Sequence, residues 1–142
     1  VPTRAMAAEL VGRHLLNEAE FWRPCPLPAL AATEPGYVGD WLPDETLSCC
    51  SWRAHCWMPV NYMAFQGLRR YGFMQEARLL AAKTEAMFLR EPFREYYRSE
   101  DGAGCGRKEF LGWSGLALFL SDELELNTDP TEISRNPILG QG

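Results

Sequence analysis

Two neighbouring segments in the middle of the chain carry apolar residues every three or four positions, a period that restricts them to packed helices. One begins at Met58, and the other runs from Met74 to Arg90 and is rich in good helix formers. Gly72 can end the first helix as a left-handed cap, and the short link Gly72–Phe73 predicts an antiparallel helical hairpin. Its two facing stripes should be Tyr62, Phe65, Leu68 and Arg69 on one side and Ala77, Leu80, Ala81, Thr84 and Phe88 on the other.

The rest of the chain predicts two further helices separated by long loops. Ala5–Leu16 and Phe110–Leu124 show helical periodicity. Phe21–Ser51 contains five prolines, which exclude a helix interior or a central strand, and Phe93–Glu109 is a polar loop with glycines. No segment alternates clearly as a strand does. We therefore predict an all-α fold whose loops gather at one end of paired helices, and four such helices cannot close a barrel alone.

Charge and hydropathy exclude several classes of partner. The net charge of −5 argues against nucleic acid and against an anionic membrane, since both require a basic surface. The longest apolar stretch, Leu111–Leu120, is interrupted by glycine and serine and is too short to span a bilayer. The first residues lack both an initiator Met and a signal-peptide pattern, so we expect the chain to begin mid-protein or after processing.

The cysteines do not predict a disulfide framework or a metal centre. Their number is odd and their spacing irregular, whereas a disulfide framework favours an even count in a smaller chain. Adjacent cysteines rarely ligate one ion together, and no second ligand pair lies at the usual spacing. We expect reduced, partly buried thiols and no metal or organic cofactor. The cysteines are Cys25, Cys49, Cys50, Cys56 and Cys105.

Two groups of motifs carry more information than periodicity does. The first is Trp52-Arg53-Ala54-His55-Cys56-Trp57, followed by Asn61-Tyr62 and later by a Tyr-Gly pair. The second is Phe93-Arg94-Glu95-Tyr96-Tyr97, then a loop with glycines at 102, 104 and 106, then Trp113-Ser114. In this order the motifs resemble the C-terminal signature of glycoside hydrolase family 63. That family includes mannosylglycerate and glucosylglycerate hydrolases and processing α-glucosidase I.

The match covers about residues 15 to 124, with two departures. Ala54 and His55 stand where the family usually has Gly-Pro, and Ser114 replaces the commoner Thr. Neither change removes a titratable catalytic group. The first could alter how the chain turns below the site.

The resemblance implies a fragment of an (α/α)₆ barrel. Residues 1–126 would be the C-terminal part of the catalytic domain, and residues 127–142 an extended or disordered tail. The implied enzyme is an inverting glycosidase of the O-glycosyl hydrolase class, acting on a small α-glucoside or α-mannoside. Its partners would be the carbohydrate substrate and the missing N-terminal part of the same barrel. Relatives occur in the cytoplasm and in secretory compartments, and we slightly favour the cytoplasm.

The resemblance assigns the general base to Glu95, whereas the general acid, an aspartate far upstream in the family, has no counterpart in this chain. Aromatic neighbours should partly desolvate Glu95, although an ordinary surface glutamate is the alternative. Glu91, Glu100, Asp101 and Glu109 are weaker candidates nearby.

The expected substrate-binding residues are Trp52, Arg53, Trp57, Asn61, Tyr62 and Trp113. Arg53 could instead hold a buried salt bridge, and the tryptophans and Tyr62 could instead fill the core. Asn61 could instead cap its helix. The isolated histidines, His14 and His55, are not expected to be catalytic. We also expect Glu95 and the Trp52–Arg53 pair to share one concave surface. The alternative function is a non-catalytic helical domain that binds carbohydrate or protein; a helical-repeat scaffold is disfavoured because no period is present.

Overall fold

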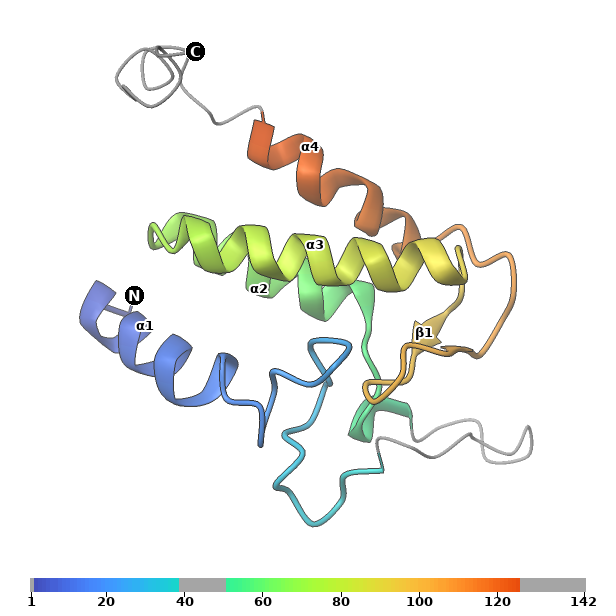
Figure 1. Ribbon diagram of the computed structural model, residues 1–142, viewed down its shortest axis with the longest axis horizontal. Helices are drawn as coiled ribbons and strands as arrows, with labels where there is room; N and C mark the ends of the chain where they lie inside the picture. Colours follow the sequence, from blue (N-terminus) through green and yellow to red (C-terminus); the bar gives the residue numbers. More distant parts are fainter. Residues whose placement is uncertain (1, 39–50, 126–142) are drawn as a thin grey trace, which may run out of the picture.

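The computed structural model describes residues 2–38 and 51–125 (Figure 1). The tail predicted for residues 127–142 lies outside these ranges, and so do Cys49 and Cys50. The described part is mostly helical, as predicted, with one small sheet in addition. Among the described helices, none combines the length and the apolar character needed to cross a bilayer.

The centre of the fold is the predicted hairpin of α2 (Met58–Arg70) and α3 (Met74–Arg90). Gly72 ends α2 with a φ of 80°, the left-handed conformation that glycine adopts without steric strain. Phe65 and Leu68 of α2 pack in one core with the first part of the α3 stripe. All five residues of that stripe are buried, so the predicted hairpin is confirmed: Ala77, Leu80, Ala81, Thr84 and Phe88.

A second core lies where α2 begins and α3 ends. Met58 packs there with Met87 and Phe88, and Tyr97 from the segment after α3 belongs to the same cluster. Figure 1 shows the sheet and the connecting loops gathered at this end of the hairpin. The predicted clustering of loops at one end of the paired helices is therefore present.

The first helical segment spans nearly the predicted residues. It consists of α1 (Arg4–Leu10), capped by the Thr3 side chain, and a π-helical segment, Val11–Leu15. Val11 and Leu15 pack against the core of the hairpin. An apolar groove of about 580 Å³ lies between this segment and α2, and Met6 and Leu10 remain exposed in it.

The prediction of the last helix is wrong in its first part. Residues Trp113–Phe119 form a 3₁₀ segment, and only Leu120–Glu125 is the α-helix α4. Glycines at 112 and 115 disfavour a regular α-helix there, because glycine loses the most conformational freedom on ordering. The Ser114 hydroxyl also donates to the Arg94 carbonyl, which ties this segment to the preceding loop.

The sheet is the element that the sequence pattern did not predict. Strand β1 (Tyr96–Tyr97) pairs antiparallel with β2 (Gly104–Cys105). Cys56 adds a third extended segment, since its backbone exchanges hydrogen bonds of 2.8 and 3.0 Å with Tyr97. Pro28 forms a bridge with Cys56 on the other side. Three loops distant in sequence are thus joined at one end of the hairpin.

Candidate functional site

Glu95 lies immediately before β1 and is held in place at three points. Its backbone N–H donates to the Arg107 carbonyl over 3.1 Å, and its carbonyl accepts from the Trp113 indole N–H over 2.7 Å. Its carboxylate atom Oε2 accepts from the Arg107 backbone N–H over 3.0 Å. These contacts fix both the backbone and one carboxylate oxygen. The other oxygen, Oε1, makes no hydrogen bond to any residue that the structure describes.

Gly106 permits the close approach of the opposite loop to this carboxylate. It has a φ of 66°, and a Cβ at this position would lie 2.6 Å from Glu95 Oε2 and 2.6 Å from a Tyr96 ring carbon. A side chain there would displace the carboxylate or the ring. Tight packing of this loop against Glu95 therefore accounts for the glycine at this position.

Aromatic rings in mutual contact form a cluster beside Glu95, here called the aromatic stack. Trp52 stacks on Trp57 with ring centroids 4.0 Å apart and an interplanar angle of 2°. Trp57 in turn contacts Tyr96 and Trp113, whose centroids lie 4.8 and 5.6 Å away. Trp57 is only 3% exposed, whereas Trp52 is 51% exposed. The stack therefore has a buried inner part and an open outer ring.

The stack connects Trp52 with Glu95, because Trp113 contacts both Trp57 and the Glu95 carbonyl. Pairing of Cys56 with Tyr97 is what brings these two motifs together. Arg53 is exposed and its side chain lies beside Gly36; it makes no ion pair within residues 2–38 and 51–125. The buried salt bridge considered for Arg53 is thus not seen in the described part. A shared concave surface for Glu95 and Trp52–Arg53 stays a prediction.

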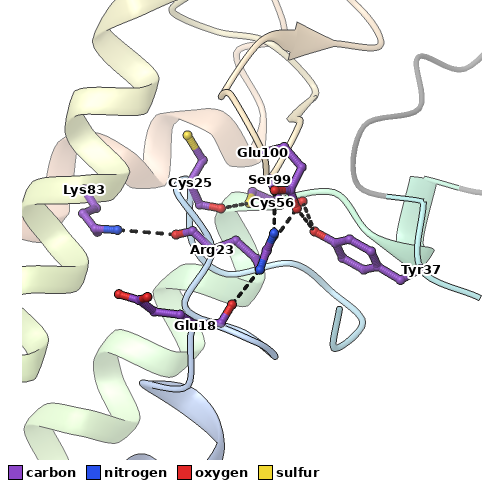
Figure 2. A network of polar contacts seen from close by, with 8 residues as sticks. All are labelled: Glu18, Arg23, Cys25, Tyr37, Cys56, Lys83, Ser99 and Glu100. Atoms are coloured by element: carbon purple, nitrogen blue, oxygen red, sulfur yellow. Dashed lines mark hydrogen bonds and ion pairs between the residues drawn. The ribbon is translucent and has the colours of Figure 1, made fainter. Parts of the chain in front are cut away.

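A polar network ties the proline-rich loop to the segment that follows β1 (Figure 2). Arg23 donates to both carboxylate oxygens of Glu100 over 3.0 and 2.7 Å. The Tyr37 hydroxyl contacts the same carboxylate and also Ser99, whose oxygen lies 2.6 Å away. No local pattern could have identified this network, since Arg23 and Glu100 lie 77 residues apart.

The chain is similar to known glycoside hydrolases over most of its length. The sequence model of the mannosylglycerate hydrolase MGH1-like glycoside hydrolase domain matches residues 1–114. The crystal structure of the family 63 mannosylglycerate hydrolase from Thermus thermophilus in complex with glucose superposes with a TM-score of 0.65 at 34% identity. The chain belongs to glycoside hydrolase family 63.

Relatives with assigned names are longer than this family 63 chain. Mannosylglycerate hydrolase of Thermus thermophilus is 44% identical over 68 residues, which are 48% of this chain and 16% of that protein. Mannosyl-oligosaccharide glucosidase of Arabidopsis thaliana is 25% identical over 121 residues, covering 75% of this chain and 14% of that protein. The glucose complex is matched over 84% of this chain and 27% of its own. The chain therefore spans between 14% and 27% of the length of these relatives.

Two of the expected substrate-binding residues, Asn61 and Tyr62, lie outside the aromatic stack and form hydrogen bonds to other parts of the chain. Asn61 is fully buried: its Oδ1 accepts from the Leu27 N–H over 2.7 Å, and its Nδ2 donates to the Trp57 carbonyl over 3.1 Å. Tyr62 donates to Glu123 of α4 and packs against the hairpin core. Asn61 is linked to the aromatic stack through Trp57, and Tyr62 links α2 to α4; a substrate contact by either residue stays a prediction.

The described cysteines of the family 63 chain are free and buried, as expected. Burial raises the pKa of the thiols of Cys25, Cys56 and Cys105, so they stay protonated near neutral pH. The Cys56 thiol donates to the Cys25 carbonyl. Within residues 2–38 and 51–125, no three potential metal-ligating side chains come together.

The network around Glu100 predicts a pH-dependent contribution to stability. Its hydrogen bonds from Arg23 hold the pKa of the Glu100 carboxyl below its usual range. Burial and the Glu100 carboxylate raise the pKa of Tyr37 to about 12. A carboxyl whose pKa is lowered by folding stabilises the fold above its ordinary pKa, and this contribution is lost as the pH falls through the folded-state value.

We expect Glu100→Gln to lower the melting temperature at pH 7, because charge-assisted hydrogen bonds contribute about 1.5–3 kcal/mol. The difference from wild type should shrink as the pH falls below the ordinary carboxyl range, since the wild-type carboxylate is then itself protonated. Melting curves at several pH values measure this. Glu18→Gln is the matched control, since Glu18 is exposed and receives the Arg23 contact through its backbone carbonyl. Equal melting temperatures for wild type and Glu100→Gln at pH 7 would contradict the prediction.

Proposed function

We propose that this chain is the C-terminal part of the catalytic (α/α)₆ barrel of an inverting glycoside hydrolase, in which Glu95 is the general base. The observation that carries the proposal is the state of the Glu95 carboxylate. One oxygen is fixed by the Arg107 N–H, and the other has no protein hydrogen-bond partner in the described part. A positioned carboxylate with one open oxygen is what activation of a water molecule requires.

In the proposed reaction, Glu95 takes a proton from water while the water oxygen attacks the anomeric carbon. A second carboxyl group protonates the departing glycosidic oxygen from the opposite face of the sugar. The two carboxyl groups of an inverting enzyme stand roughly 6.5–9.5 Å apart, which leaves room for that water. In this family the acid lies upstream, so we place it in the part of the barrel that this chain does not contain.

The aromatic stack supports a sugar as the ligand. Flat aromatic rings cover the apolar faces of sugar rings. The Trp52 ring is half exposed, and its other face stacks on Trp57. Thermus thermophilus mannosylglycerate hydrolase has been crystallised with glucose and with Tris and D-glycerate. A small α-glucoside or α-mannoside is therefore the substrate class we propose. Arg53 supplies an exposed cation next to Trp52 for a carboxylate or for hydroxyl groups.

The direct test is turnover by the full-length polypeptide that contains this chain. Mannosylglycerate, glucosylglycerate, trehalose and glucosylated oligosaccharides are incubated with it, and proton NMR follows the anomer released first. We expect hydrolysis of at least one α-linked substrate with initial release of the β-sugar. Initial release of the α-sugar would overturn the inverting mechanism. Saturable binding without hydrolysis of any of them would favour the non-catalytic alternative.

Substitution of Trp52 tests the sugar platform. We expect Trp52→Ala to raise KM about two- to tenfold with little change in melting temperature, since Trp52 is half exposed and aromatic stacking contributes about 0.5–1.5 kcal/mol. Trp57→Ala should instead lower stability by about 3–5 kcal/mol, because Trp57 is buried. Kinetics and melting curves separate the two effects. An unchanged KM in Trp52→Ala would remove Trp52 from the binding site.

A further inference from the structure

We infer that Arg94 is a positioning residue for Glu95 and acts through the peptide group between Gly106 and Arg107. This inference rests on the proposed function of Glu95. The Arg94 side chain extends into the glycine-containing loop. Its Nη2 donates to the Gly104 carbonyl over 2.8 Å and to the Gly106 carbonyl over 3.4 Å.

The Gly106 carbonyl and the Arg107 N–H are the two ends of one planar peptide group. One end accepts from the Arg94 guanidinium, and the other donates to Glu95 Oε2 over 3.0 Å. Rotation of this peptide would break both contacts at once. A cationic donor at the carbonyl also polarises the peptide and strengthens its N–H as a donor. Arg94 therefore holds the group that orients the carboxylate, although it does not touch the carboxylate itself.

The surroundings of Arg94 fit a role in positioning Glu95 better than a role in stabilising the fold. Its Nε is buried and makes no hydrogen bond to any residue in the described part of the chain. A buried donor without a partner is unfavourable, so it calls for an explanation beyond stability. Its nearest carboxylate, on Glu91, lies 3.9 Å from Nη1 and is half exposed, which makes this a weak ion pair.

The backbone of Arg94 is fixed as firmly as its side chain. Its N–H donates to the Tyr97 hydroxyl over 3.2 Å, and its carbonyl accepts from Ser114. Phe93, just before it, has a φ of 56°, a left-handed conformation uncommon for a bulky residue. Strained residues of this kind persist where the surroundings over-determine them. Arg94 is thus anchored well enough to act as a rigid brace for the loop.

The test is a double-mutant cycle in the full-length enzyme with Arg94→Met, Glu95→Gln and the double variant. An activated α-glycosyl fluoride keeps residual turnover measurable. We expect Arg94→Met to lower kcat about 10–100-fold, as a small displacement of a catalytic group does, with KM changed less than about threefold. In the Glu95→Gln background the same substitution should lower kcat less than about twofold, because its effect passes through Glu95.

Arg94→Lys and Lys108→Met complete the experiment. Lysine can reach one carbonyl, so Arg94→Lys should retain part of the lost kcat. Lys108 is exposed nearby and has no polar contact in the described part, so Lys108→Met should leave kcat unchanged. If Arg94→Met does not fold, the cycle is run with Arg94→Lys. Equal losses of kcat in both backgrounds, or a loss confined to KM, would overturn the role of Arg94. Normal turnover in Glu95→Gln would instead overturn the proposed function.

Discussion

Glu95→Gln is expected to lower turnover of the full-length enzyme by about 10²–10⁴-fold while leaving substrate binding nearly intact. Glutamine has the size of glutamate, and its side-chain oxygen can still accept a hydrogen bond from the Arg107 N–H. The contact between residue 95 and the glycine-containing loop is therefore kept. It cannot accept a proton from water at neutral pH, and general-base catalysis contributes roughly that factor. Steady-state kinetics give kcat, and calorimetry with the intact substrate gives the dissociation constant.

Glu109→Gln is the matched control for this prediction. Glu109 is an exposed glutamate of the same loop region whose side chain makes no hydrogen bond or ion pair in the described part, so Glu109→Gln should keep wild-type turnover. A Glu95→Gln enzyme with near-normal kcat would remove Glu95 from the reaction. A Glu95→Gln enzyme that no longer binds substrate would instead indicate a structural role for the carboxylate.

The helices of this chain were predictable because their determinants are local. Phe65, Leu68 and Leu80 meet because a period near 3.6 places each on one face of its helix and a short link at Gly72 folds the helices back. The start of the last helix was not predictable in the same way. Its apolar residues continue toward Trp113, yet glycines and the tie from Ser114 to Arg94 change the local geometry.

The arrangement around the candidate site depends on contacts between distant segments. Cys56 pairs with Tyr97 through backbone hydrogen bonds, and such bonds cannot be recognised from the pattern of side chains in the sequence. Strands of two residues are also too short to show alternation. Glu95 itself was singled out by resemblance, because no pattern distinguishes its carboxyl from those of Glu91 or Glu100. The structure adds the anchoring of its Oε2 and the hydrogen bond from Arg94 to the Gly104 carbonyl, neither of which could be derived from spacing.

The groove between α1 and α2 leads to the second large expected effect, which concerns packing of this chain against the rest of the proposed barrel. It encloses about 580 Å³, and Met6 and Leu10 in it are 60% and 57% exposed. A second apolar cavity of about 430 Å³ shares Leu10 and Leu15 with it. Contiguous exposed apolar surface of this kind marks a place where another protein element packs. We propose that helices from the rest of the barrel cover this surface, since the chain spans only 27% of the solved structure that it matches.

Introduction of a charge tests this proposal directly. In the full-length protein, Leu10→Asp should lower the melting temperature sharply, because it would bury an unpaired carboxylate against apolar helices, at a cost of several kcal/mol. Leu89→Asp is the matched control: Leu89 lies on α3, is 70% exposed and does not line the groove, so its effect should stay within about 0.5 kcal/mol.

In the isolated chain the groove should be exposed to water. With the groove uncovered, it should bind an apolar dye such as ANS and self-associate in ultracentrifugation, and Leu10→Asp should reduce both effects. In the full-length protein the dye should find no such surface. A monodisperse, dye-silent isolated chain with a sharp melting transition would contradict the proposal, because its groove would then be stable in water without a covering helix.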